Sequence, residues 1–231
     1  MNHKYHRQTL LPEIGEEGQC KLREARVLIV GVGGLGCPIA LYLASAGVGH
    51  LGIVDNDTVS LSNLHRQVLY EEVELGQPKA ECAIHHLRAR NSDIELKAYP
   101  MRLTKDNAEQ LIAEYDFVVD GCDNHATRYL ISDVCEKQHK PYIYAAIGAF
   151  QGQVAILCHD EEAPTYRTLF PDEKTMCALE APKGVIGTTP AITGSLVANE
   201  VLKLIVGFGE PLLGKLFLID LLTLNTQMIR L

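Results

Sequence analysis

The 231-residue sequence lacks several features that would mark an obvious class of protein. It has no run of Lys and Arg, and its net charge of −8 gives no basic face for nucleic acid. Its apolar stretches are too short, or too often interrupted by Gly and polar residues, to span a bilayer. Residues 1–19 lack the apolar core of a signal peptide. We therefore expect a cytoplasmic protein that binds neither nucleic acid nor membranes.

Paired cysteines are also missing. The seven cysteines are an odd number, and no two of them form a C-x-x-C pair. This pattern argues against a disulfide framework and against a four-cysteine zinc site. Most of these thiols are therefore expected to be small buried apolar groups.

The sequence does contain a regular alternation of short apolar runs with helical patterns. Runs such as RVLIVG are typical of strands buried on both faces of a parallel sheet. Alternating with helices, they predict an α/β fold: a Rossmann-like, doubly wound sheet that is mostly parallel. The expected strands are residues 26–31, 51–55, 94–99, 116–120 and 142–147, and the expected helices are 15–24, 34–46, 78–91, 106–114 and 124–138.

The pattern changes after residue 148. The apolar run at 152–157 follows the preceding strand so closely that we expect the two to pair antiparallel. Residues 159–187 show no clear periodicity and predict a long loop, which is usually functional or partly disordered. A helix at 190–206 and strands at 215–220 and 226–231 complete the prediction. We expect a single domain over residues 1–231, with antiparallel strands in its C-terminal half.

The run of glycines at 31–36, GVGGLG, fits the turn of a dinucleotide-binding fold. Gly31 and Gly33 let the backbone turn sharply and approach a ligand, and Gly36 lets the next helix pack against the sheet. The N-terminus of that helix offers unpaired N–H groups to a phosphate. Asp55 ends the next expected strand, where an acid can bond ribose hydroxyls. These features predict an adenosine nucleotide but do not separate NAD from ATP.

The segment DNDTVSLSNLHRQ at 55–67 adds charge to this picture. Arg66 lies in it and Lys79 follows Pro78, whereas an NAD site needs no pair of cations beyond its ribose acid. A triphosphate does need them, because its negative charge must be neutralised in the transition state. The two cations therefore favour ATP over NAD.

A second acidic motif, DGCDN, occupies residues 120–124. It places Asp120 and Asp123 at the carboxyl end of an expected strand, facing the same crevice as the glycine turn. An aspartate there can hold a magnesium ion that bridges phosphates. Equally, Asp123 and Asn124 can cap the helix that follows. Spacing alone leaves both interpretations open.

Together, five motifs resemble the ThiF/MoeB/HesA family, the bacterial relatives of ubiquitin-activating enzymes. These motifs, in order, are KYHRQ, VGVGGLG, DNDTVSLSNLHRQ, GQPKAE and DGCDN. The resemblance implies an adenylyltransferase that binds ATP and Mg²⁺ and activates the C-terminal glycine of a ubiquitin-like sulfur carrier ending in Gly-Gly. It thus implies ATP rather than NAD, with a nucleotide-binding half over about 1–148 and a carrier-binding half over about 149–231.

The resemblance also implies roles for individual residues. Gly34 would approach the phosphates, Asp55 would hold the ribose, and Asp123 would bind magnesium. Arg7 would reach into the active site of a second subunit, which implies a homodimer; otherwise it is an exposed N-terminal charge. The implied catalytic residues are Arg66, Lys79, Asp123 and Arg7, and the implied ATP-binding residues are Gly31, Gly33, Gly34, Asp55, Asp57, Asn63, Arg66, Gln67 and Lys79.

The sequence departs from the family where many members hold a structural zinc with two C-x-x-C pairs. Thr165 and Thr168 stand at the first pair of cysteine positions, in PTYRTLFP, and no second pair follows. Hydroxyls are poor zinc ligands beside thiolates, so we expect no zinc. The segment must then be held by packing alone or stay mobile.

Cys177 lies where several family members have a cysteine after that segment. In thiamine-pathway members, this cysteine can link covalently to the activated carrier. The alternative is a small residue at the end of a loop. The stretch GVIGTTPAITGS at 184–195 is assigned to packing and to carrier contact.

The leading hypothesis is a sulfur-carrier adenylyltransferase of thiamine biosynthesis. The alternative within the family is the molybdopterin-synthase carrier. Two other classes are an NAD-dependent oxidoreductase, which Arg66 and Lys79 disfavour, and a non-catalytic carrier-binding scaffold. A scaffold would be expected to lack Arg66, Lys79 or Asp123, and all three are present.

Overall fold

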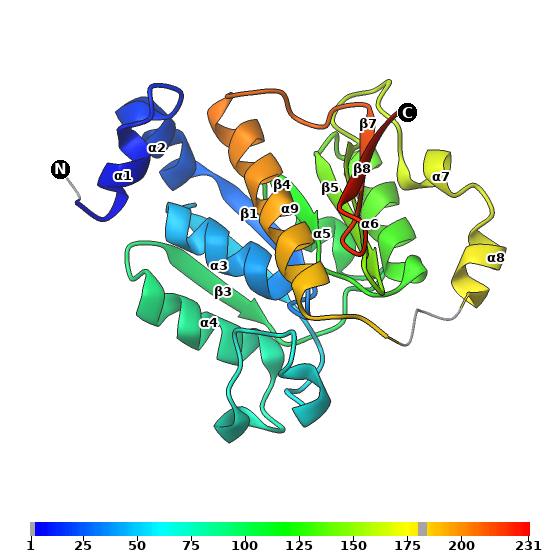
Figure 1. Cartoon of the computed structure of the whole chain (residues 1–231), viewed down its shortest axis with the longest axis horizontal. Helices are drawn as coiled ribbons and strands as arrows, with labels where there is room; N and C mark the ends of the chain where they lie inside the picture. Colours follow the sequence, from blue (N-terminus) through cyan, green and yellow to red (C-terminus); the bar gives the residue numbers. More distant parts are fainter. Residues whose placement is uncertain (1–2, 180–183) are drawn as a thin grey trace.

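The computed structural model describes residues 3–179 and 184–231, and it consists of three layers with a mixed sheet in the middle (Figure 1). The sheet has eight strands in the order β3-β2-β1-β4-β5-β6-β7-β8. Its strands are β1 (Arg26–Val30), β2 (His50–Val54), β3 (Glu95–Tyr99), β4 (Phe117–Asp120), β5 (Tyr142–Gly148), β6 (Gln151–Leu157), β7 (Lys215–Asp220) and β8 (Asn225–Arg230).

The first five strands are parallel, and the last three join them antiparallel. Residues 27–30 of β1 are buried because helices cover both faces of the sheet, as the apolar run predicts. β6 pairs antiparallel with β5, with Tyr142 opposite Leu157. The predicted Rossmann-like fold, mostly parallel with antiparallel strands in its C-terminal half, is confirmed.

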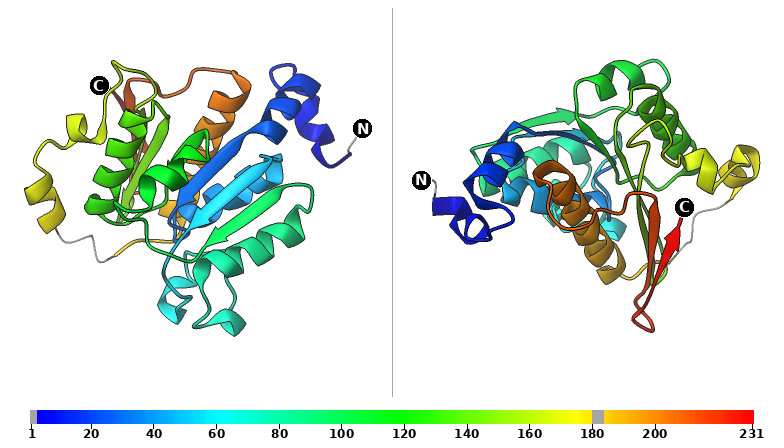
Figure 2. Two further views of the ribbon diagram at one scale, coloured as in Figure 1. Left: turned by 180° about the vertical axis from the view of Figure 1, so that it is seen from behind. Right: turned by 90° about the horizontal axis from the view of Figure 1, so that it is seen from above.

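Helices cover the two faces of the sheet unequally. α2, α3, α4 and α9 share one apolar cluster with the strands, and α5 and α6 share the other. Figure 2 shows α5 and α6 from behind, on the face opposite α9. The helices are α1 (His6–Thr9), α2 (Gly15–Glu24), α3 (Gly36–Ala46), α4 (Lys79–Arg90), α5 (Ala108–Ala113), α6 (His125–Lys137), α7 (Tyr166–Leu169), α8 (Glu173–Ala178) and α9 (Thr188–Val206), with 3₁₀ turns η1 (His3–Tyr5), η2 (Leu61–Asn63) and η3 (Glu72–Glu74).

The prediction of a long loop over residues 159–187 is wrong where the short helices α7 and α8 form. Residues 180–183 lie outside the described residues, but α7 and α8 form before them. Side-chain caps start both helices: the Thr165 hydroxyl accepts from the Thr168 amide at 3.3 Å, and Asp172 Oδ1 accepts from the Thr175 amide at 3.0 Å. Local capping, rather than apolar periodicity, therefore orders this stretch.

Predicted boundaries of the longer elements differ from the structure by one or two residues, as expected at fraying ends. α3 begins at Gly36 rather than residue 34, and α4 begins at Lys79 because Pro78 is its extended N-cap residue. α9 begins at Thr188 rather than residue 190. Over the described ranges, none of the helices combines the length and apolar character needed to cross a membrane.

Candidate nucleotide-binding site

A cavity of about 1030 Å³ opens at the carboxyl ends of the parallel strands, where the order reverses between β1 and β4. In doubly wound sheets this is the position at which ligands bind. Loops after β1, β2 and β4 line it, and so do β5 and the side chains of Phe170, Met176, Cys177, Leu179 and Val185. Of the predicted site residues, those that line it are Gly31, Gly33, Gly34, Asp55, Asp57, Arg66, Gln67, Lys79, Asp123 and Cys177.

Two glycines bring the loops after β1 and β4 into direct contact. Gly31 has φ +89°, and a Cβ there would lie 2.6 Å from the carbonyl oxygen of Gly121. A Cβ on Gly121 would in turn overlap the carbonyl oxygen of Gly31. A side chain is therefore excluded at both positions, and the backbone of each loop supports the other.

Asp55 braces the glycine turn itself. Its Oδ2 accepts from the Val32 amide at 2.8 Å, and its Oδ1 accepts from the Asp57 amide at 2.8 Å. Burial raises the pKa of Asp55, although both backbone bonds oppose that rise. The sequence suggested only a ribose ligand here. Each carboxylate oxygen keeps a second lone pair, so the brace leaves room for such a contact.

Cationic and amide side chains reach the cavity from the segment after β2 and from the first residue of α4. The Lys79 Nζ lies 3.0 Å from Asp57 Oδ2, and the Lys79 side chain is only 6% exposed. Arg66 donates to the Ser62 carbonyl oxygen at 3.1 Å and lines the cavity. The Oε1 of Gln67 is buried, and none of the residues that the structure describes hydrogen-bonds to it. An unpaired buried acceptor is costly unless a ligand supplies a donor, so Gln67 fits a bound molecule.

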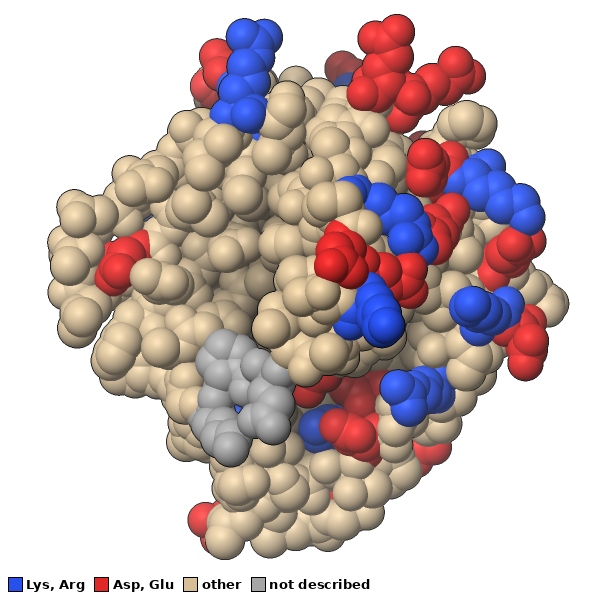
Figure 3. Space-filling view, turned by 90° about the vertical axis from the view of Figure 1, so that its right-hand side faces the viewer, with Lys and Arg blue, Asp and Glu red and all other residues tan. Residues whose placement is uncertain are grey.

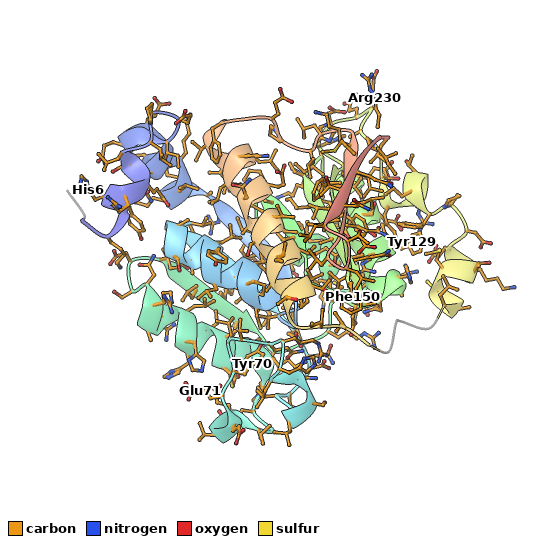
Figure 4. All side chains as sticks on the ribbon, viewed as in Figure 1. His6, Tyr70, Glu71, Tyr129, Phe150 and Arg230 are labelled. Atoms are coloured by element: carbon orange, nitrogen blue, oxygen red, sulfur yellow. The ribbon has the colours of Figure 1, made fainter. Side chains whose placement is uncertain are left out.

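Two predicted site residues are not among the described residues that line the cavity. Asn63 ends η2, and its carbonyl oxygen accepts from the amides of Arg66 at 3.0 Å and Gln67 at 2.9 Å. It therefore shapes the turn that presents those two side chains. Arg7 lies in α1, next to His6 of Figure 4, at the end of the molecule near the N-terminus.

The role of Asp120 is structural. It is fully buried, and its carboxylate binds Arg128 Nε at 3.0 Å, the Tyr142 hydroxyl at 2.8 Å and the Cys122 amide at 2.8 Å. Arg128 also donates to the Cys122 carbonyl oxygen at 2.8 Å. Full burial and three protein donors commit this carboxylate to holding the loop after β4, Arg128 and Tyr142 together.

Of the two roles that spacing left open, the structure shows the helix cap, which Asn124 supplies, and the magnesium role of Asp123 stays a prediction. The Asn124 side chain accepts from the Thr127 amide at 2.9 Å and caps α6. Asp123 is exposed in the cavity, where its Oδ1 accepts from the side-chain amide of Asn124 at 3.4 Å. An exposed carboxylate of this kind has the oxygen chemistry that Mg²⁺ prefers.

The segment that carries Thr165 and Thr168 is anchored by packing and ion pairs. The two threonine hydroxyls lie 3.3 Å apart and cap α7. Tyr166 is fully buried, and Arg167 binds Asp133 through Nε at 2.7 Å and through a second nitrogen at 2.8 Å. The absence of zinc stays a prediction. Cys177 is exposed on α8 and lines the cavity, and its covalent link to a carrier also stays a prediction.

Sequence reasoning missed His125, the first residue of α6. It lines the cavity, and its Nδ1 lies 2.6 Å from the Tyr166 hydroxyl. Burial, together with the nearby Arg128, lowers the pKa of His125. His125 lies just outside the DGCDN motif, which ends at Asn124. The one signal in the sequence is that His125 begins a helix at this edge of the sheet.

Fold and cavity thus define a Rossmann-type protein with a candidate nucleotide site where β1 and β4 diverge. The model of the ThiF family matches residues 5–231. The chain belongs to this family, which confirms the resemblance carried by its motifs.

Curated relatives agree with this assignment. The chain is 48% identical over 225 residues to a sulfur carrier protein adenylyltransferase of Thermus thermophilus, covering 95% of this chain and 83% of the relative. It is 46% identical to the mouse adenylyltransferase and sulfurtransferase MOCS3, covering 99% of this chain and half of the relative. The predicted enzyme class, a nucleotidyltransferase, is confirmed.

A solved structure shows the same architecture. The crystal structure of Escherichia coli MccB with ATP superposes with a TM-score of 0.89 at 25% identity, covering 100% of this chain and 71% of MccB.

Proposed function

We propose that this chain is an ATP-dependent adenylyltransferase that activates the C-terminal glycine of a ubiquitin-like sulfur carrier. The observation that carries the proposal is the shape of the cavity. One continuous space joins the glycine turn and the cations Arg66 and Lys79 to a second region beside Cys177. It can therefore hold a nucleotide and the end of an acyl substrate together.

The chemistry needs no nucleophile from the protein. A carboxylate oxygen of the carrier attacks the α-phosphorus of ATP, the new P–O bond forms, and the bond to the leaving pyrophosphate breaks. Arg66 and Lys79 stabilise the charge that develops, and the glycine turn orients the phosphates. Gln67 accepts from the bound nucleotide through its unpaired Oε1, and Asp57 keeps Lys79 in place. Asn63 orients Arg66 and Gln67.

Asp123 is the residue we assign to Mg²⁺. It is exposed in the cavity on the loop after β4. A magnesium ion bound there would neutralise phosphate charge. The protein's own contribution is to fix the carboxylate beside the glycine turn through the contact between Gly31 and Gly121.

The partner is assigned to the thiamine pathway, with the molybdopterin carrier as the alternative that the test decides. Cys177 would form a thioester after adenylation: its sulfur attacks the acyl carbon and AMP leaves. Exposure of Cys177 on the cavity wall supports this step. The functional unit would be a homodimer in which Arg7 of one subunit completes the site of the other.

The test is ATP–pyrophosphate exchange with the whole chain, Mg²⁺, and thiamine-type and molybdopterin-type carriers supplied separately. We expect exchange with one carrier, which also names the pathway. A carrier truncated by its last two glycines is the matched control and should give none. Tight ATP binding without exchange for either carrier would contradict catalysis and favour the scaffold.

A further inference from the structure

His125 connects the cavity to the segment of residues 159–179. It begins α6 and lines the cavity, and its Nδ1 lies 2.6 Å from the hydroxyl of Tyr166. Tyr166 begins α7, and its backbone amide donates to the Ser132 hydroxyl at 2.9 Å. The orientation of one imidazole in the cavity wall therefore depends on a residue of α7.

The Tyr166 end of this connection is held firmly. The Tyr166 ring is fully buried, with ring centroids of Tyr129 at 4.8 Å, Phe170 at 4.9 Å and Tyr144 at 5.5 Å. Tyr129, labelled in Figure 4, belongs to α6 and lies beside α7 and α8. Aromatic packing of this kind fixes the hydroxyl in space, and the hydroxyl fixes the imidazole.

Hydrogen-bond chemistry then places the imidazole proton. Tyr166 is fully buried, and among the described residues its hydroxyl has one hydrogen-bond partner, Nδ1 of His125, whereas a buried phenol proton needs an acceptor. The Tyr166 proton is thereby directed to Nδ1 of His125. A neutral imidazole that accepts at Nδ1 carries its own proton at Nε2, which becomes a donor.

His125 lines a different part of the cavity wall from Arg66 and Lys79. It follows β4 and its ring centroid is 6.3 Å from that of Phe170, whereas Arg66 and Lys79 follow β2. Phe170, Met176 and Cys177 also line the cavity. Figure 3 shows the molecule hollowed on the α7–α8 side, with visible walls that carry few charged side chains. A neutral donor suits an uncharged peptide better than a triphosphate.

Resting on the proposed function, we propose that His125 determines specificity for the acyl substrate: its Nε2–H donates to a peptide carbonyl oxygen in the Gly-Gly end of the carrier. Tyr166 is the positioning residue that keeps this proton on Nε2. In this proposal, His125 forms no hydrogen bond with the nucleotide.

Two substitutions of His125 separate this role from a structural one. In His125→Gln the side-chain amide nitrogen reaches nearly as far as Nε2, whereas in His125→Asn it stops near the position of Nδ1. In pyrophosphate exchange, we expect His125→Asn to raise the KM for the carrier about tenfold, the loss of one hydrogen bond, and the KM for ATP less than about twofold. His125→Gln should recover most of that loss. Tyr166→Phe, which keeps the ring, should raise the carrier KM to an intermediate value.

Carrier binding measured by fluorescence anisotropy without ATP gives a second readout that needs no turnover. The order of Kd values should be wild type, Gln, Tyr166→Phe, Asn. Equal carrier affinity in all four proteins, failure of the wild type to bind either carrier, or a rise in the KM for ATP alone would each overturn the assignment. Binding that follows this order without pyrophosphate exchange in the wild type would instead reject catalysis while keeping His125 as the carrier contact.

Discussion

At the scale of single residues, burial decides what each aspartate of the DGCDN motif does. Asp120 is fully buried against Arg128, and Asp123 is exposed. We expect Asp120→Asn to lower the free energy of unfolding by about 3–5 kcal/mol, because it leaves the Arg128 charge buried without its partner. Urea unfolding followed by circular dichroism measures this loss.

Asp123→Asn is the matched control for that measurement. It removes an exposed carboxylate in the same loop, so the free energy of unfolding should change by less than about 0.5 kcal/mol. Its exchange activity should fall instead. If both variants unfold at the same urea concentration, the ion pair between Asp120 and Arg128 does not contribute the predicted free energy of unfolding.

Arg66 carries the charge-stabilising role in the proposed reaction. We expect Arg66→Ala to slow pyrophosphate exchange about 10²–10³-fold, the usual effect of losing one donor to a developing oxyanion. Arg88→Ala, on the exposed part of α4, removes the same charge away from the cavity and should leave the rate unchanged. Near-normal exchange by Arg66→Ala would remove Arg66 from the mechanism.

The seven thiols differ in reactivity for the same reason of burial. Cys20 and Cys177 are exposed and the other five are buried, and burial raises the pKa of Cys37 to about 12. Because the thiolate is the reactive form, brief treatment of the native protein with iodoacetamide should modify Cys20 and Cys177 alone. Peptide mass spectrometry checks this, with urea-unfolded protein as the fully labelled control.

At the scale of elements, capping matters most where helices are shortest. α7 has four residues and depends on Thr165, whose hydroxyl accepts from the Thr168 amide at 3.3 Å. Thr165→Ala should cost α7 about 1 kcal/mol, so its amides should exchange about fivefold faster with deuterium. The amide of Thr175, capped by Asp172 in α8, is the internal reference. Uniform acceleration across both helices would contradict a local effect.

The elements that sequence could predict are those with enough residues to show a period. β1 and α9 show clear patterns, whereas the short helices α7 and α8 do not. The ion pair between Asp120 and Arg128 has no local signature, because tertiary packing turns the two side chains together. The cavity residues came from motifs, but the Tyr166 contact that places His125 spans 41 positions in the chain. Such pairings cannot be derived from a pattern.

At the scale of the whole molecule, the proposed homodimer can be tested by mixing two inactive variants. If Arg7 acts in the partner's site, Arg7→Ala and Arg66→Ala each lose exchange alone. Subunit mixing should then restore up to about a quarter of the wild-type rate. After random exchange of an equal mixture, half of the dimers contain one subunit of each variant, and each mixed dimer has one intact site out of two. An equal mixture that stays inactive after verified subunit exchange would show that both residues act in the same subunit.

The contact between Gly31 and Gly121 limits how this molecule can evolve. A side chain on either residue would overlap the backbone of the other, so neither loop can be redesigned one mutation at a time. Variation that retunes the enzyme for a new acyl substrate must enter elsewhere, at residues such as Phe170 and Met176 that line the cavity. On the proposed function, the backbone contact therefore constrains the nucleotide end of the site more tightly than the side chains at the carrier end.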